Sequence, residues 1–237
     1  MKLQFKDVIG KHKNIPAVIC GHGPSLNFYK KKFVDLQNQG WIRYDCNDWF
    51  NFMSIPPTYW LFASTVDTIK SQQDKITAYN STILYADSVD LMDRDKVDNI
   101  LVNTFYLPYD QRHFKGMPCG ENIIGCCKHI IPNRLTIQEE LAKYSKTDIL
   151  YGGYNAGCHM IAFALVMGCN PIYVAGIELD YKFGYASTIV RPTGYDLCRE
   201  GCLEDFKKFN MIATALGSKI YQLNPNSTYN EFEFIKL

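Results

Sequence analysis

The sequence predicts an α/β fold: a doubly wound, mostly parallel, Rossmann-like sheet with an irregular inserted region. Two observations predict it. Short apolar runs that end in glycine or in a polar residue alternate with amphipathic segments along the 237 residues, and such runs are typical of strands buried on both faces of a parallel sheet. The segment between Gly153 and Gly168 is apolar on nearly all sides, as a helix buried between two layers would be.

The first half of the chain contains four expected strands with helices between them. The strands are expected over 16–21, 41–46, 58–63 and 81–87. An amphipathic helix is expected over 27–40, where Gly40 ends it. A second helix is expected after the third strand, with Ser64 as its N-cap.

The second half begins with a stretch of unclear period, around 90–131, that we expect to be a less regular insertion. The remaining expected elements are a helix over 136–147, the buried helix that ends at Gly168, a strand over 171–176, a long helix over 200–217 and a strand over 219–223. No linker or repeat interrupts the chain, so residues 1–237 are expected to form a single Rossmann-like domain.

The composition is that of an ordinary globular protein, with 47% hydrophobic residues and a net charge of +1. This balance argues against a nucleic-acid-binding surface over the whole protein, although a nucleic-acid acceptor in a local groove stays open.

No apolar run reaches the roughly 18 residues of a membrane span, and the first residues lack the apolar core of a signal peptide. A cytoplasmic location is therefore expected, and homo-oligomer formation is left open.

The nine cysteines are expected to be reduced, because several of them fall inside apolar elements and their number is odd. Cys126, Cys127 and His129 form the densest group of candidate metal ligands. Adjacent cysteines are poorly placed to converge on one tetrahedral ion, so no metal site is predicted from the sequence.

Small or polar residues follow five of the expected strands directly. They are Gly21-His22-Gly23-Pro24-Ser25, Cys46-Asn47-Asp48, Ala63-Ser64-Thr65, Gly176-Ile177-Glu178 and Asn224-Pro225-Asn226-Ser227. In open α/β sheets, ligands bind beyond the carboxyl ends of the strands. These residues are therefore expected to converge on one crevice.

The residue types in these turns suit an anionic nucleotide. Glycines such as Gly21 and Gly23 let the backbone approach a phosphate, and the free N–H groups of a helix start bind it. Ser25 adds a hydroxyl donor, Asn47 can read a base or ribose edge, and the helix start at 155–157 offers a second anion site. The first turn lacks the third glycine of the dinucleotide fingerprint and the lysine of a P-loop, so NAD and a P-loop ATP site are disfavoured.

Four segments, in this order, resemble landmarks of the bacterial sialyltransferases of glycosyltransferase family 42. The segments are ICGHGPSL, RYDCNDWF, NAGCHMIAFALVMGCNPIYVAGIEL and IYQLNPNS. Their order and spacing match over most of the chain, and the middle region is unmatched. The first turn and the glycine-led helix also resemble the archaeal 6-hydroxymethylpterin diphosphokinases and related phage proteins.

The family 42 resemblance implies a CMP-sugar site. It implies that His22, Gly23 and Ser25 lie at the phosphate and ribose of the nucleotide. It also implies that Asn47 is the family's nucleotide-binding asparagine.

The same resemblance implies roles for the second half of the chain. The helix start Asn155-Ala156-Gly157 would contact cytidine, although an alanine here replaces a serine of the family. Gly176-Ile177-Glu178 would match the Gly-Ile-Asp strand end, with glutamate for aspartate. Tyr181 and Tyr185 would match a tyrosine pair that stabilises the leaving phosphate.

One departure from the family concerns the general base. The resemblance implies a histidine in the loop after the Gly-Ile-Asp strand, but no histidine follows His159 in this chain. If an acceptor hydroxyl has to be deprotonated, the candidates are the carboxylates of Asp180 and Glu178 and the imidazole of His22. Tyr185 completes the candidate catalytic residues.

Three functions stay open on the sequence. The first is a glycosyltransferase that moves a sugar from a nucleotide-activated donor, of the CMP-sugar type, to a hydroxyl-bearing acceptor, with no tightly bound cofactor. The second is a diphosphokinase that acts on a pterin-like alcohol with ATP and magnesium, for which Asp45, Asp48, Glu178 and Asp180 offer carboxylates. The third is a nucleotide-binding module without catalytic activity, which the missing loop histidine favours.

Overall fold

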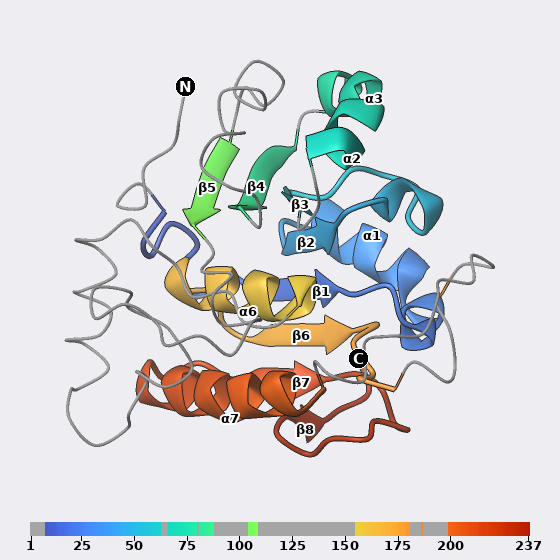
Figure 1. Cartoon of the computed structure of the whole chain (residues 1–237). Coiled ribbons are helices and arrows are strands. Elements are labelled where there is room, and N and C mark those ends of the chain that lie inside the picture. The colour runs from blue at the N-terminus through green and yellow to red at the C-terminus, as the bar shows by residue number, and fades with distance from the viewer. Residues whose placement is uncertain are drawn as a thin grey trace.

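The computed structural model describes residues 8–62, 66–79, 81–87, 104–108, 155–180, 186 and 199–237. In these residues eight strands form one sheet in the order β5-β4-β3-β2-β1-β6-β7-β8, and every neighbouring pair is parallel (Figure 1). The strands are β1 (Ala17–Cys20), β2 (Ile42–Cys46), β3 (Tyr59–Phe62), β4 (Thr82–Asp87), β5 (Thr104–Pro108), β6 (Ile172–Ala175), β7 (Ile220–Gln222) and β8 (Glu233–Phe234). The helices are α1 (Lys30–Asn38), α2 (Val66–Ser71), α3 (Gln73–Ala78), α6 (Ala156–Val166) and α7 (Arg199–Ala215), with the 3-10 helices η2 (Pro24–Phe28) and η3 (Trp49–Asn51).

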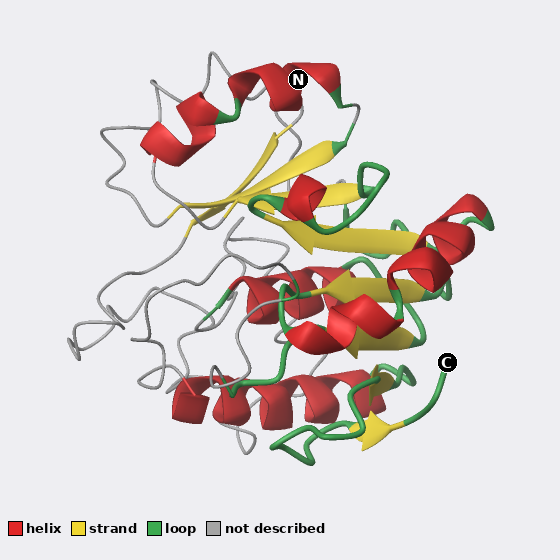
Figure 2. Ribbon diagram, turned by 90° about the vertical axis from the view of Figure 1, so that its right-hand side faces the viewer, coloured by secondary structure: helices red, strands yellow, loops and turns green. Residues whose placement is uncertain are grey.

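Helices cover both faces of the sheet (Figure 2). The alternation of side chains along β1 separates the two layers: Ala17 and Ile19 pack in the cluster that contains α6 and α7, whereas Val18 and Cys20 pack in the cluster that contains α1. All four residues are fully buried, as expected for a central strand of a parallel sheet. None of the described helices combines the length and the apolar character that crossing a membrane requires.

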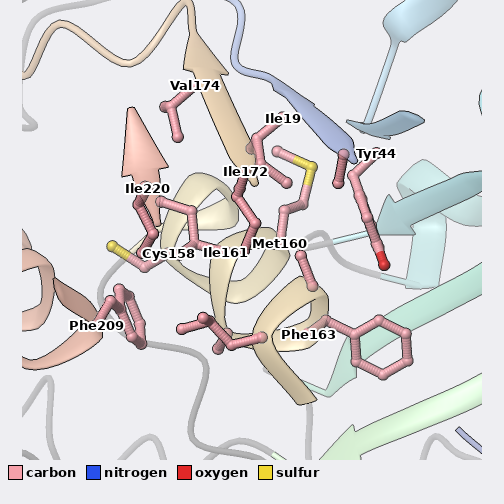
Figure 3. Packing of buried hydrophobic residues seen from close by; sticks show 14 of the residues in the cluster. Ile19, Tyr44, Cys158, Met160, Ile161, Phe163, Ile172, Val174, Phe209 and Ile220 are labelled. Carbon is pink, nitrogen blue, oxygen red and sulfur yellow. The ribbon is translucent and has the colours of Figure 1, made fainter. Parts of the chain in front are cut away.

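The larger of the two core clusters is built around α6 (Figure 3). Met160, Ile161 and Phe163 of this helix are fully buried, and Phe209 of α7 belongs to the same cluster. Figure 1 shows α6 and α7 side by side over the same face of the sheet. A helix that is apolar on every side suits this buried position. Gly168 follows the helix with a φ of +79°, the left-handed conformation in which glycine ends helices.

The expected fold class is confirmed, and so are most of the expected elements in the described part of the chain. The exceptions lie at edges and boundaries. The helix expected over 27–40 begins instead as η2, and α1 starts only at Lys30. The expected irregular insertion contributes the edge strand β5, and the short strand β8 was not predicted. The helix expected over 136–147 lies outside the described residues, as does the expected N-cap Ser64.

The direction of chain progression across the sheet reverses between β1 and β6. From β1 the chain continues to β2 on one side, and from β6 it continues to β7 on the other. Cys20 of β1 pairs with Ala175 of β6 at the carboxyl end of both strands, so the two following turns leave the sheet side by side. In doubly wound sheets, ligands bind outside the strand ends at such a switch point.

Candidate functional site

The turns after β1 and β6 are joined to each other by hydrogen bonds. The amide of Gly21 donates to the carbonyl oxygen of Ala175 over 2.8 Å, and the amide of Gly23 donates to that of Gly176 over 2.8 Å. In return, the amide of Gly176 donates to the hydroxyl oxygen of Ser25 over 2.8 Å. The two turns therefore form one connected backbone structure at the switch point.

The glycines of these turns are required by the close approach of the two backbones. A Cβ on Gly21 would lie 2.2 Å from the carbonyl oxygen of Gly176, and a Cβ on Gly176 would lie 2.1 Å from that of Gly21. Gly176 also has a φ of +73°, which disfavours any side chain. Contact between the turns thus explains both glycines without any ligand.

The side chain of Ile177 fills the space beneath these turns and reaches the start of α6. A Cβ on Gly157 would lie 2.3 Å from Cδ1 of Ile177, and one on Gly21 would lie 2.5 Å from its Cγ1. Just before Gly157, the side chain of Asn155 caps α6, because its Oδ1 accepts from the amide of Cys158 over 2.9 Å. The start of α6, half-buried Ala156 included, is therefore fixed against the β6 turn.

Glu178 places its carboxylate on the turn that the sequence assigned to a phosphate. Its Oε1 accepts from the amide of Ser25 over 2.9 Å. Its Oε2 lies where a Cβ of Gly23 would be, 1.5 Å from that position. Burial raises the pKa of Glu178, while the hydrogen bonds from Ser25 pull it down. A phosphate contact at Ser25, which is only 3% exposed, stays a prediction that requires Glu178 to give up this amide.

His22 lies in a buried cluster between the ends of β1 and β2. Its Nε2 is 3.2 Å from Oδ1 of Asp45 and 3.7 Å from the Sγ of Cys46, and its Nδ1 is 3.5 Å from Oδ1 of Asp48. The ring of Phe52 stacks on the imidazole with 4.1 Å between centroids. Both ring nitrogens of His22 thus face acidic groups inside the protein.

The electrostatics of this cluster favour the charged form of the imidazole. Burial by itself would lower the pKa of His22, but Cys46 and the hydrogen-bonded carboxylate of Asp45 outweigh burial and raise it to about 10. The second oxygen of Asp45, Oδ2, is buried and has no hydrogen-bond partner. The charge of the imidazole is therefore balanced by the carboxylates of Asp45 and Asp48 that surround it.

Asn47 begins the turn after β2 in a conformation that few other residues adopt. Its φ is +43°, a value that asparagine tolerates better than most side chains. Its amide donates to the carbonyl oxygen of Leu61 over 2.8 Å, and its carbonyl oxygen accepts from Nε1 of Trp60 over 2.7 Å. The backbone of Asn47 is thus held firmly, and its half-buried side chain starts from a fixed position beyond the strand end.

The turn after β7 joins the site through Thr228, whose hydroxyl donates to the carbonyl oxygen of Glu178 over 3.1 Å. Asn226 and Ser227 precede it in a turn, in which Asn226 is exposed and its amide donates to Oδ1 of Asn224. The structure therefore connects the β7 turn to the β6 turn through Thr228, the residue that follows the expected segment Asn224-Pro225-Asn226-Ser227.

Only some of the remaining expected site residues lie in the described part of the chain. Pro24 starts η2 and is half-buried, and Asp180 is half-buried two residues after Glu178. Ser64, Tyr181 and Tyr185 lie outside the described residues.

Sequence reasoning gave no site role to Phe52 or Thr228. It placed Cys46 and Asp48 at a strand end beside the expected crevice and named Asp45 and Asp48 as carboxylates for magnesium. It named none of these three residues as a partner of His22. Asp45 did carry a signal, because a charged residue inside a buried strand needs a partner. Its partner is 23 positions away, and the fold alone brings the two together.

The backbone resembles solved structures of a sialyltransferase. It matches CstII of Campylobacter jejuni in complex with CMP at a TM-score of 0.55 and 14% identity, over 94% of this chain and 85% of that chain. For the complex with the substrate analogue CMP-3FNeuAc the TM-score is 0.53 at 14% identity, over 93% and 86% of the two chains. For CST-II in complex with a trisaccharide acceptor and CMP it is 0.54 at 16% identity, over 92% and 84%.

No family model matches the sequence, and no curated protein sequence matches it. At the identities found, the likeness to CstII shows a shared Rossmann-like α/β fold. The resemblance read from the sequence motifs is therefore supported at the level of the fold. The further resemblance to pterin diphosphokinases finds no support in these comparisons.

Proposed function

We propose that the protein is a glycosyltransferase that takes a sugar from a CMP-activated donor and transfers it to a hydroxyl-bearing acceptor. One observation carries the proposal: the turns after β1, β2, β6 and β7 converge at the switch point of a sheet whose fold is that of CstII. The solved CstII complexes contain CMP and a substrate analogue of the CMP-sugar type.

In this proposal the nucleotide lies over the β1 and β2 turns, where Asn47 reads the nucleotide and the turn that carries His22 and Gly23 approaches its phosphate. The start of α6 at 155–157 and the β6 turn at 176–178 form the opposite wall. Tyr181 and Tyr185 would complete the site at the leaving group.

For deprotonation of the acceptor we assign Asp180. His22 is turned toward Asp45 and Asp48 by both of its ring nitrogens, and Glu178 binds the amide of Ser25. Asp180 is half-buried and follows Glu178 by two residues, so it leaves the β6 turn close to the proposed site. A base must reach the proton that it removes, and this position in the chain supports the assignment.

The test is a panel of nucleotides in a thermal-shift experiment, with CMP, CDP, UDP, GDP and ATP, each with and without magnesium. A ligand at roughly 100 times its Kd adds about 2.7 kcal/mol to the stability of the folded state. We expect CMP to give the largest shift, independent of magnesium. A shift with ATP that requires magnesium, and none with CMP, would instead point to phosphoryl or diphosphoryl transfer.

Replacing Asn47 with glycine is expected to weaken CMP binding about tenfold, because one polar contact of the nucleotide is lost. Glycine is preferred to alanine here because it keeps the φ of +43° without strain. Isothermal titration with CMP measures the change in Kd.

The matched control is Asn38→Gly at the exposed C-terminal end of α1, which should leave the Kd unchanged. If the Asn47 variant binds CMP as tightly as the unaltered protein, Asn47 has no role in the site.

Catalysis is tested separately from binding. Release of CMP from CMP-sugar donors, with and without simple sugar acceptors, distinguishes an enzyme from a binding module. Asp180→Asn should retain CMP affinity and lose turnover. CMP binding without any donor turnover would leave the nucleotide-binding module as the better description.

A further inference from the structure

Three potential metal ligands of different chemistry meet between β1 and β2. Nε2 of His22, a carboxylate oxygen of Asp45 and Sγ of Cys46 all lie within 4.8 Å of one another, and all three residues are buried. His22 Nε2 is 3.2 Å from Asp45 Oδ1 and 3.7 Å from Cys46 Sγ. Two ligands of a tetrahedral zinc ion lie about 3.3–3.6 Å apart, given zinc–nitrogen and zinc–sulfur bonds of about 2.0 and 2.3 Å.

The surroundings of His22 hold its ring in the orientation that such a site needs. Asp48 faces Nδ1 at 3.5 Å, and the ring of Phe52 stacks on the imidazole. In metal sites, a carboxylate on the far nitrogen of a histidine fixes the tautomer that presents the other nitrogen to the ion. Asp48 has this position relative to Nε2.

The cluster also contains an acceptor that the protein does not satisfy. Asp45 is 0% exposed, and its Oδ2 is buried without a hydrogen-bond partner. The neighbouring cation on β2, Arg43, donates Nη2 to the carbonyl oxygen of Ile55. A buried carboxylate oxygen without a partner is costly, and a bound cation would remove this cost.

We propose that His22, Asp45 and Cys46 bind one divalent cation of the zinc class, with Asp48 as the positioning residue behind His22. An imidazole, a carboxylate and a thiolate are ligands that zinc takes together, whereas magnesium and calcium take oxygen ligands. Binding releases the protons of the thiol and of Nε2 to the solvent. Three protein ligands leave one coordination position for water or for an oxygen of a bound ligand.

The test uses cobalt(II), which reports thiolate ligation by a sulfur-to-metal charge-transfer band. The purified full chain is stripped with a chelator and titrated with cobalt(II) in the absence of any nucleotide, so the result does not depend on the proposed glycosyltransferase activity. We expect one equivalent to bind with a thiolate band and with visible bands of a tetrahedral site. Zinc should displace the cobalt and remove these bands.

Variants locate the site. Cys46→Ser should abolish the thiolate band, and Asp48→Asn should keep the band but weaken cobalt binding about 10- to 100-fold. The control Cys169→Ala removes a different buried thiol, which contacts Tyr44 instead of His22. It should change neither the thiolate band nor the affinity for cobalt. Circular dichroism of each variant confirms that it is folded.

A second control removes the other cysteine group of the sequence through Cys126→Ser with Cys127→Ser. The proposal is overturned if the thiolate band survives Cys46→Ser, if it disappears only in this double variant, or if the folded full chain binds no cobalt. In the last two cases, the His22 cluster is a hydrogen-bonded group without a metal.

Discussion

Replacing Gly176 with alanine is expected to lower the free energy of unfolding by about 3 kcal/mol or more. Two costs add together. Gly176 has a φ of +73°, a conformation that costs an L-residue about 1–2 kcal/mol. The new Cβ would also lie 2.1 Å from the carbonyl oxygen of Gly21, and a backbone atom cannot rotate away as a side chain can. Urea denaturation followed by circular dichroism measures the loss.

Gly217→Ala is the matched control, because Gly217 has a φ of +69° but open space where the Cβ would be. The Gly217→Ala variant should lose only the cost of placing a side chain at a positive φ, which is about 1–2 kcal/mol of unfolding free energy. Gly21→Ala should destabilise through the clash alone, and the double variant should lose less than the sum, since both methyl groups disturb one contact. Equal losses for Gly176→Ala and Gly217→Ala would show that the two turns do not touch.

Gly21 and Gly176 show which features of the site could be predicted from the sequence and which could not. The apolar runs that end at Gly21 and Gly176 correctly predicted two buried strands and the place where the strand ends meet. Gly21 also suggested a phosphate cradle in the first turn, but in the structure Gly21 and Gly176 each make room for the other turn. A position without a Cβ admits a ligand or a neighbouring backbone equally well, so the sequence could not distinguish the two.

The elements that the sequence missed depend on partners distant in the chain. The edge strand β5 is defined by its pairing with β4, and turn residues around it hide its pattern. The two-residue strand β8 pairs with β7, where Gln222 Nε2 donates to the carbonyl oxygens of Tyr229 and Phe232 and so holds the returning chain. The buried cluster at His22 was missed for the same reason, because its members come from two strands and their turns.

The second prediction of large effect concerns acid, and it rests on His159 inside α6. This side chain is 5% exposed, and burial lowers its pKa from 6.5 to about 4. Below pH 6.5 the unfolded chain therefore takes up a proton at this residue while the folded chain does not. Stability should be complete above pH 6.5 and should fall by about 3 kcal/mol as the pH drops toward 4.

His159→Gln and His159→Leu remove this titration and should make the stability less steep between pH 6.5 and 4. The measured quantity is the change of unfolding free energy with pH, so a constant loss of packing in either variant does not matter. Glu178, whose pKa is raised by burial, acts in the opposite direction, but it is present in every variant and its contribution cancels.

His12→Gln is the control. Burial also lowers the pKa of His12, but this residue is only half-buried. Its removal should therefore change the slope of stability with pH less. An unchanged slope in both His159 variants would mean that His159 can be charged within the folded protein, and hence that α6 is not sealed from water.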